Sequence, residues 1–190
     1  MIKKHLRLYL FVGLMIACII FLAFTMNNST SADSESESEI YTISNASELK
    51  TFANKVNAGN SFEGKTVKLL ADIDLNGSEN NQWNPIGGST NNTFKGIFEG
   101  DGHYIKHIYI SNKSFSYNYG LFGINEGTIK NLYILDSLFD ISSMQPSINI
   151  GAIAGENKGT ITCCANYSDI ITTVDADHAY TYIGGLVRIT

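Results

Sequence analysis

Two histidines of this 190-residue chain have the spacing of a zinc-peptidase motif. In H-E-x-x-H both rings lie on one face of a helix and bind zinc, while the glutamate acts as the base. His103 and His107 have this spacing, but Tyr104 stands in place of the glutamate. The flanking residues alternate as in a strand, which would place the histidines about 13 Å apart at ~3.3 Å per residue. We therefore predict no zinc-peptidase site here.

A second pattern imitates the start of a calcium-binding loop. Asp72, Asp74, Asn76 and Gly77 give the series D-x-D-x-N-G. The twelfth position of such a loop carries a bidentate glutamate, whereas here it is Trp83. The surrounding residues are typical of a strand followed by a turn. We interpret the segment as structural and predict no metal or cofactor in this chain.

Two adjacent cysteines, Cys163 and Cys164, suggest a vicinal disulfide or a metal site. Neighbouring residues of a strand point to opposite faces, so we expect Cys164 to face the core and Cys163 to face outward, both as unbridged thiols. A third cysteine, Cys18, lies inside an apolar run. A lipidated cysteine should begin a polar mature chain, so we do not expect a lipoprotein.

Paired carboxylates are the remaining route to catalysis, because two of them suffice to hydrolyse a glycosidic bond. Glu99, Asp101 and Glu126 would be candidates if they approached each other at one corner of the fold. No basic or aromatic cluster accompanies them, which favours a solvated turn. We predict that the chain is not an enzyme and name no catalytic residue; a polysaccharide-acting enzyme is the alternative.

The chain contains a repeat. Residues 120–132 read G-L-F-G-I-N-E-G-T-I-K-N-L, and a second copy stands at 152–164. The second half of the unit also matches residues 102–108, and a third copy begins at Gly185. A unit of this length that repeats along a chain is typical of one coil of a solenoid.

Stacking of the repeats predicts the core. The predicted columns are Ile105 with Ile129 and Ile161, Ile108 with Leu132 and Cys164, Ile110 with Ile134, and Tyr109 with Tyr133. Alternation along a strand would turn the tyrosine column outward and the others inward. Gly127 and Gly159 would mark a corner, where a side chain would clash. Residues 111–119 and 137–149 would form loops between coils.

A helix is predicted at the start of the folded part. Asn45 and Glu48 have the spacing of a capping box, and Gly59 is placed to end the helix. The apolar residues share one helical face: Leu49, Phe52, Ala53 and Val56. We interpret this helix as a cap over the first coil.

Four motifs follow the helix in order: A-D-I-D-L at 71–75, W-x-P-I-G at 83–87, F-x-G-x-F-x-G-x-G-H-x-I at 94–105 and G-L-F-G at 120–123. This series resembles bacterial surface proteins that carry the GLUG motif, which also occurs in stalk regions of metallopeptidases that cleave immunoglobulin A. The resemblance covers residues 40–187, although Cys163 stands where the family usually has asparagine. It implies an all-β fold, a right-handed parallel β-helix, together with an extracellular location and no catalytic site.

The N-terminus is typical of an export signal. Lys3, Lys4 and Arg7 precede an uncharged apolar run at 8–24. Residues 1–32 are therefore predicted to be a cleaved signal peptide or an uncleaved signal-anchor. Residues 33–40 alternate serine with carboxylates and should form a disordered acidic spacer. The β-helix domain then covers 41–190 and is expected to be incomplete at its C-terminus, because the third repeat copy is cut short.

Charge and exposed aromatics complete the functional prediction. Ten Lys and Arg and 18 Asp and Glu follow residue 32, which leaves a net charge of −8, a poor match for nucleic acid or anionic lipid. The membrane would be contacted only through an uncleaved N-terminal segment. We predict a non-catalytic, stalk or adhesin-like module at the cell surface, with self-association at the uncapped C-terminal end. It would bind a host or cell-wall glycan or protein, with these weak candidate contacts: Tyr109, Tyr117, Tyr119 and Tyr133. A further alternative is the N-terminal remnant of a larger surface protein or peptidase.

Overall fold

The protein is described by a computed structural model that covers residues 40–111, 117–143, 147–174 and 180–189. The predicted signal or anchor, Cys18 and residues 33–39 of the predicted spacer lie outside the described residues. The chain from Ser38 onward is one compact unit. Within the described ranges, no helix is long and apolar enough to cross a membrane.

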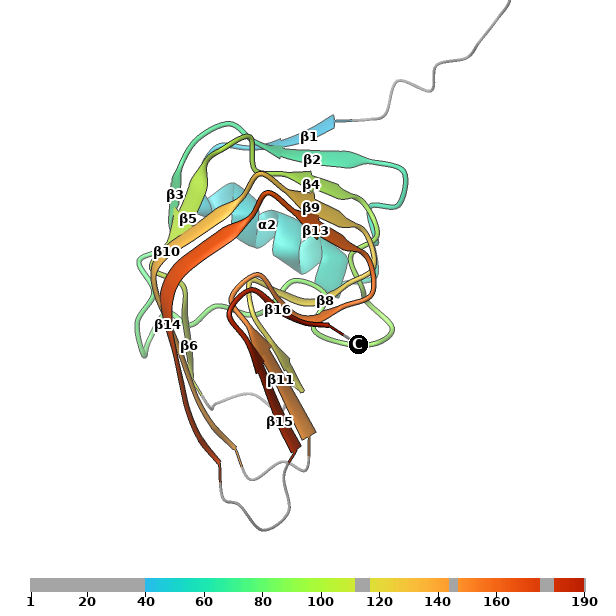
Figure 1. Cartoon of the computed structure of the whole chain (residues 1–190). Coiled ribbons are helices and arrows are strands. Elements are labelled where there is room, and N and C mark those ends of the chain that lie inside the picture. The colour runs from blue at the N-terminus through green and yellow to red at the C-terminus, as the bar shows by residue number, and fades with distance from the viewer. Residues whose placement is uncertain (1–39, 112–116, 144–146, 175–179, 190) are drawn as a thin grey trace, which may run out of the picture. The chain divides into compact units, whose positions relative to one another are not determined.

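The fold is a parallel β-solenoid of about three coils with one helix, α2 (Ala46–Asn57), as predicted (Figure 1). The first wall contains β1 (Ile40–Ile43), β2 (Thr66–Leu69), β4 (Ile97–Glu99), β9 (Thr128–Lys130) and β13 (Thr160–Thr162). The second contains β3 (Ile73–Asp74), β5 (Tyr104–Lys106), β10 (Tyr133–Ser143) and β14 (Ala165–Val174), with β6 (Tyr109–Ser111) also paired to β10. The third contains β7 (Asn118–Tyr119), β11 (Ser147–Gly151) and β15 (Tyr180–Gly184), and the fourth β8 (Phe122–Asn125), β12 (Ala154–Asn157) and β16 (Val187–Ile189).

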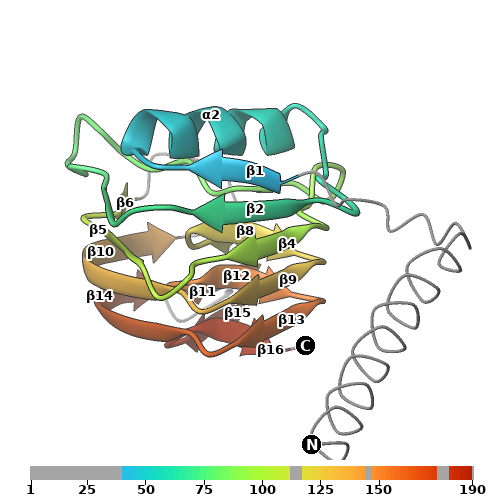
Figure 2. The same ribbon diagram turned by 90° about the horizontal axis from the view of Figure 1, so that it is seen from above.

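Local signals determine α2, and the prediction of this helix is confirmed. The side chain of Asn45 accepts from the backbone N–H of Glu48, and the Glu48 carboxylate accepts from the N–H of Ser44. The four residues of the predicted apolar face are buried, and Gly59 has a φ of +102° just beyond the helix. Figure 2 shows α2 lying across one end of the stack, with β13 to β16 at the other end.

The folded part does not open with this helix, because β1 comes first. β1 pairs in parallel with β2, so Ile43 lies beside Leu69. The predicted boundary is therefore off by one residue, since Ile40 belongs to the strand and not to the spacer. A strand this short gives too little pattern to reveal a partner that lies beyond the helix.

Aromatic rings fill the end of the solenoid beneath α2. The Phe52 ring of the helix lies 5.7 Å from Phe94 and 5.9 Å from Phe98, centroid to centroid. Phe98 in turn lies 5.3 Å from Phe122 of the same coil. These rings are fully buried, so α2 closes the apolar interior as the predicted cap should.

The predicted stacking holds for the later coils but not for the first. Ile129 and Ile161 pair as expected. Leu132 and Cys164 also occupy equivalent positions, because they directly precede the paired residues Tyr133 and Ala165. The partner of Ile129 in the first coil is Phe98, however, while Ile105 pairs with Ile134 and Ile110 with Phe139. Ile108 lies beside Ser137, whose Oγ accepts from its N–H at 2.9 Å.

The error has a geometric cause. The first coil contains an additional turn, Gly100-Asp101-Gly102, in which Asp101 and Gly102 have positive φ. The motif alignment matched residues 102–108 to 126–132, but the strand that pairs with β9 is β4, and the corner glycine beside Gly127 is Gly96. A Cβ on Gly127 would lie 2.1 Å from the carbonyl oxygen of Gly96, and one on Gly159 would lie 2.0 Å from that of Gly127. Gly127 and Gly159 therefore mark a corner, as predicted.

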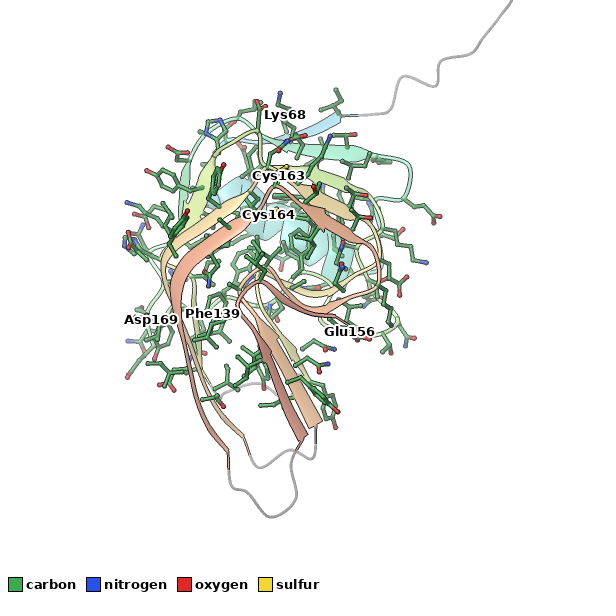
Figure 3. All side chains as sticks on the ribbon, viewed as in Figure 1. Lys68, Phe139, Glu156, Cys163, Cys164 and Asp169 are labelled. Carbon is green, nitrogen blue, oxygen red and sulfur yellow. The ribbon has the colours of Figure 1, made fainter. Side chains whose placement is uncertain are left out.

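Part of the predicted loop at 137–149 is strand. β10 continues to Ser143 and β11 begins at Ser147. Figure 1 shows these strands with β14 and β15 as a narrow extension beyond the part of the coil that α2 covers. Apolar residues at alternate positions face each other inside it, and all are fully buried: Phe139, Ile141, Ile148 and Ile150. Figure 3 shows Phe139 between the two facing walls and Asp169 on the outside.

Candidate ligand-binding face

One outer wall of the solenoid carries four tyrosines. Strands β5, β6, β10 and β14 alternate inward apolar residues with outward ones, and the outward set includes Tyr104, Tyr109, Tyr133 and Tyr167. We call this surface the tyrosine wall. Tyr133 is paired in register with Tyr104, and Tyr167 with Leu135. Tyr133 is 38% exposed and Tyr167 is 67% exposed, while the other two are half-buried. The four phenols lie on three successive coils, whose strands are spaced by about 4.8 Å.

The structure separates the four tyrosines that the sequence nominated. Tyr109 and Tyr133 both lie on the tyrosine wall, but Tyr109 pairs with Leu138, so the predicted Tyr109–Tyr133 column is wrong. Tyr117 is 55% exposed but precedes β7 of a different wall. Tyr119 is only 2% exposed. Its nomination as a ligand contact is therefore wrong, because its side chain packs into the core.

Sequence reasoning missed two members of the wall, Tyr104 and Tyr167. Tyr104 is adjacent to the inward Ile105, and Tyr167 to the inward Asn166. Because neighbouring residues of a strand face opposite ways, this alternation was the signal in the sequence that places both tyrosines outside. Tyr104 was considered only as a substitution in a zinc motif. Tyr167 has no tyrosine at the equivalent position of the preceding coil, where Leu135 stands, so the repeat gave no column to follow.

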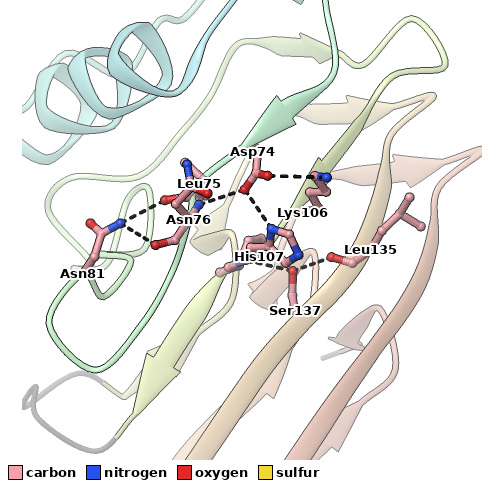
Figure 4. A network of polar contacts seen from close by, with 9 residues as sticks. Asp74, Leu75, Asn76, Asn81, Lys106, His107, Leu135 and Ser137 are labelled. Carbon is pink, nitrogen blue, oxygen red and sulfur yellow. Dashed lines mark hydrogen bonds and ion pairs between the residues drawn. The ribbon is translucent and has the colours of Figure 1, made fainter.

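The N-terminal side of the wall is formed by two aspartate–histidine pairs. Nδ1 of His103 lies 3.0 Å from Oδ1 of Asp72, and Nδ1 of His107 lies 2.8 Å from Oδ1 of Asp74. Figure 4 shows Asp74 between His107, the backbone N–H of Asn76 and Lys106, whose Nζ is 3.4 Å from Oδ2. Asp72 and Asp74, the two aspartates of the calcium-loop pattern, thus connect their coil to the next one through His103 and His107. Over the described ranges, no three His, Cys, Asp or Glu side chains come together as metal ligands.

These contacts favour the ionised aspartates. The pKa of Asp74 is lowered by the hydrogen bond from the N–H of Asn76 and then by His107. Burial alone would raise the pKa of Asp72, but hydrogen bonds from His103 and from the N–H of Tyr104 outweigh it and lower the pKa. The two pairs therefore act as cross-links between β3 and β5 that depend on carboxylate charge.

The three candidate catalytic carboxylates do not converge. Glu99 pairs with Lys130 at the end of β9, with its Oε2 3.0 Å from Nζ, whereas Glu126 lies before β9 and pairs with Lys95 at 3.5 Å. Asp101 is close to Glu99 but forms its own ion pair with Lys68 at 2.9 Å. The alternative in which all three meet at one corner is therefore wrong, and each carboxylate is paired with a lysine instead.

Glu99 is the most enclosed of these carboxylates. Burial alone would raise its pKa, but a 2.8 Å hydrogen bond from Nδ2 of Asn131, with further contributions from the N–H of Asp101 and from Lys130, lowers it overall. A general acid at neutral pH requires the opposite, a raised pKa. The carboxylate is held as an anion and links the first two coils.

The cysteines lie at a corner and not within a strand. Cys163 is exposed with a φ of +52°, the backbone conformation that Asn131 adopts one coil earlier. Cys164 is half-buried against the core, and burial raises the pKa of its thiol. Both are free thiols, and the predicted outward and inward directions are confirmed.

Two asparagine ladders connect the coils, and sequence reasoning did not locate them. Nδ2 of Asn149 donates to Oδ1 of Asn118 at 2.7 Å, and Nδ2 of Asn125 donates to Oδ1 of Asn157 at 2.6 Å. Asn125 is fully buried and also bonds both the N–H and the C=O of Gly127. The first ladder lies within the paired strands β7 and β11, and the second lies at the ends of β8 and β12, where Asn125 satisfies backbone groups of the following corner.

Comparisons with known proteins agree with this architecture. No family model matches the chain, so the GLUG assignment stays a prediction. The chain is 28% identical over 129 residues to halomucin of Haloquadratum walsbyi (strain DSM 16790 / HBSQ001), an alignment that covers 64% of this chain and 1% of halomucin.

A similar fold occurs in a crystal structure of a proposed immunoglobulin A1 protease from Bacteroides ovatus. The TM-score is 0.50 and the sequence identity 20%, over 78% of this chain and 46% of that one. At this identity the likeness shows the fold alone. The chain therefore corresponds to a part of each of these larger proteins.

Proposed function

We propose that this chain is a non-catalytic, exported surface module that binds glycan through the tyrosine wall. The observation that carries the proposal is the set of four tyrosines on one wall, with Tyr133 and Tyr167 well exposed. Tyrosine offers an apolar ring for the C–H face of a sugar and a hydroxyl for its polar groups. The four rings are distributed over three successive coils, so an extended polymer could contact more than one of them.

The carboxylates support binding without turnover. A glycoside hydrolase of the usual type needs two carboxyl groups across the scissile bond, one of them protonated. Glu99, Asp72 and Asp74 instead have lowered pKa values and bonded partners. The likeness to parts of halomucin and of a proposed immunoglobulin A1 protease supports an exported location and a stalk or adhesin-like role within a larger assembly.

Glycan binding is tested with the full chain on immobilised plant and host polysaccharides. Replacing Tyr133 and Tyr167 together by alanine should weaken binding about thirtyfold, from about 1 kcal/mol for each ring. Tyr117→Ala is the matched control, because the exposure of Tyr117 lies between those of Tyr133 and Tyr167 but Tyr117 lies off the wall. Saturable binding that the double variant loses supports the proposal. Product release would favour a polysaccharide-acting enzyme, and the absence of both would leave a spacer.

A further inference from the structure

A hollow of about 200 Å³ opens between α2 and residues 82–84. Its lining combines an apolar floor, Ala53 and Trp83, with a polar rim: Lys50, Asn54, Gln82 and Asn84. Trp83, the only tryptophan of the chain, is fixed because its Nε1–H donates to the carbonyl of Leu121 at 3.0 Å. The volume is many times the ~10–15 Å³ that a cavity needs to hold one water molecule. This suits a single sugar ring and its substituents.

The rim has unused hydrogen-bonding capacity. The side-chain amides of Asn54 and Asn84 are exposed and make no hydrogen bond with the described part of the chain. Lys50 donates from Nζ to Oδ1 of Asn81 at 2.9 Å, which leaves two of its three N–H groups. Gln82 accepts from the N–H of Ser111 and donates one N–H to the carbonyl of Glu79, which leaves its second N–H. The rim therefore offers seven N–H groups together with the amide oxygens of Asn54 and Asn84.

The charge of the rim is opposite to that of the chain. The lining includes one ammonium group, from Lys50, and no carboxylate, although the chain as a whole has a net charge of −5. Amides alone would suit a neutral sugar. An ammonium beside three amides in a shallow pocket favours a ligand with a carboxylate, because hydrogen bonds between charged partners are about twice as strong as neutral ones.

The pocket lies next to the tyrosine wall. Three of its lining residues, Lys50, Gln82 and Trp83, also line a crevice that reaches His107 and Tyr109 and is too narrow to hold a water molecule. We propose that the pocket binds a carboxylate-bearing sugar, a uronate unit, at one end of a glycan that lies along the tyrosine wall. The placement of this unit in a longer glycan rests on the proposed function, whereas the pocket can be tested alone.

The test is an NMR titration of the full chain with glucuronate, and with glucose as the neutral probe. Glucuronate should shift the indole N–H of Trp83 and the side-chain amides of Asn54 and Asn84, with an affinity at least tenfold above that of glucose. Lys50→Gln should remove this preference. Lys55→Gln is the matched control, since it removes the same charge from the same helix outside the pocket.

Each result of this titration either supports or overturns the proposed uronate site. Loss of the preference in Lys50→Gln but not in Lys55→Gln, with unchanged unfolding temperatures, supports the site. Equal affinity for glucose and glucuronate, no shift with either, or equal binding of N-acetylglutamate would overturn the uronate assignment. Failure of the pocket leaves polysaccharide binding by the tyrosine wall intact. Conversely, glucuronate binding without any polysaccharide binding would refute the function proposed for the wall while retaining the pocket.

Discussion

The corner glycines provide the sharpest test of the stacked architecture. Replacing Gly127 by alanine would place a Cβ 2.1 Å from the carbonyl oxygen of Gly96 and 2.7 Å from the carbonyl carbon of Lys95. In real proteins a Cβ atom essentially never lies within 3.0 Å of a heavy atom outside its own residue and the two neighbouring residues of the chain. Both contacts are backbone atoms, so no side chain can rotate away. Two coils would have to separate by about 1 Å, against a strand spacing of about 4.8 Å.

The cost follows from the bonds that such a separation stretches. The N–H of Thr128 donates to the carbonyl of Gly96 at 2.9 Å, and that of Glu126 to the carbonyl of Phe94 at 2.8 Å. Losing one or two such bonds costs about 0.5–1.5 kcal/mol each, and overpacking a tight site adds about 1–3 kcal/mol. We expect Gly127→Ala to lower the free energy of unfolding by about 3 kcal/mol. In a domain of this size that corresponds to about 6–12 °C in Tm.

Gly185→Ala is the control, because a Cβ there would meet no atom within 4 Å. Thermal unfolding followed by circular dichroism should place this variant within about 2 °C of the wild type, since the energy change should stay within about 0.5 kcal/mol. The reasoning is refuted if Gly127→Ala unfolds within 1 kcal/mol of the wild type, estimated with ~1 kcal/mol per 2–4 °C, or if Gly185→Ala is equally harmful.

Three further predictions concern single side chains. Cys163→Asn should raise the free energy of unfolding by about 0.5–1 kcal/mol, because asparagine tolerates the left-handed backbone at this position better than cysteine does; urea unfolding beside Cys163→Val, which should be less stable, checks the sign. Asp74→Asn should weaken the fold at pH 6 but not near pH 2: the folded-state pKa of Asp74 is lowered, so its contribution is present above the ordinary value of 3.8 and is lost as the pH falls through the folded-state pKa. A stability difference that persists in acid would speak against this linkage. Asn125→Ala should cost about 2–3 kcal/mol, because the N–H and C=O of Gly127 lose their buried partner; Asn84→Ala, at an exposed site, should change Tm little.

The features that sequence reasoning found are those with local causes. The capping box, the buried face of α2 and its terminal glycine all lie between Asn45 and Gly59, and each appears as expected. The corner at Gly127 and Gly159 was found because both copies of the repeat preserve it. The repeat itself predicted a solenoid, since stacked coils place like residues side by side, and the resemblance to GLUG-motif proteins implied that its walls are parallel β-strands.

The features that were missed depend on register. The first coil contains one more turn than the second, so a motif match placed Ile105 on Ile129, although it pairs with Ile134. That shift also separated Tyr109 from Tyr133 and hid the relation between Tyr104 and Tyr133. The strand β1 was missed because its only signal is its partner, β2. A site built from several coils is therefore the part of such a protein that sequence patterns locate least well.

The parallel register has a consequence for how the chain acquires its structure. Thr160 pairs with Thr128, Thr128 with Ile97 and Ile97 with Thr66, so each of these strands stacks on the strand of the coil made just before it. No described strand of this wall pairs with a strand from the far end of the chain. The entropic cost of loop closure is therefore moderate at every step. A chain that emerges N-terminus first can complete α2 and its first strands, and each later coil then adds to a finished template. Assembly of the wall is thus vectorial, and its order in time repeats the order of the coils in space.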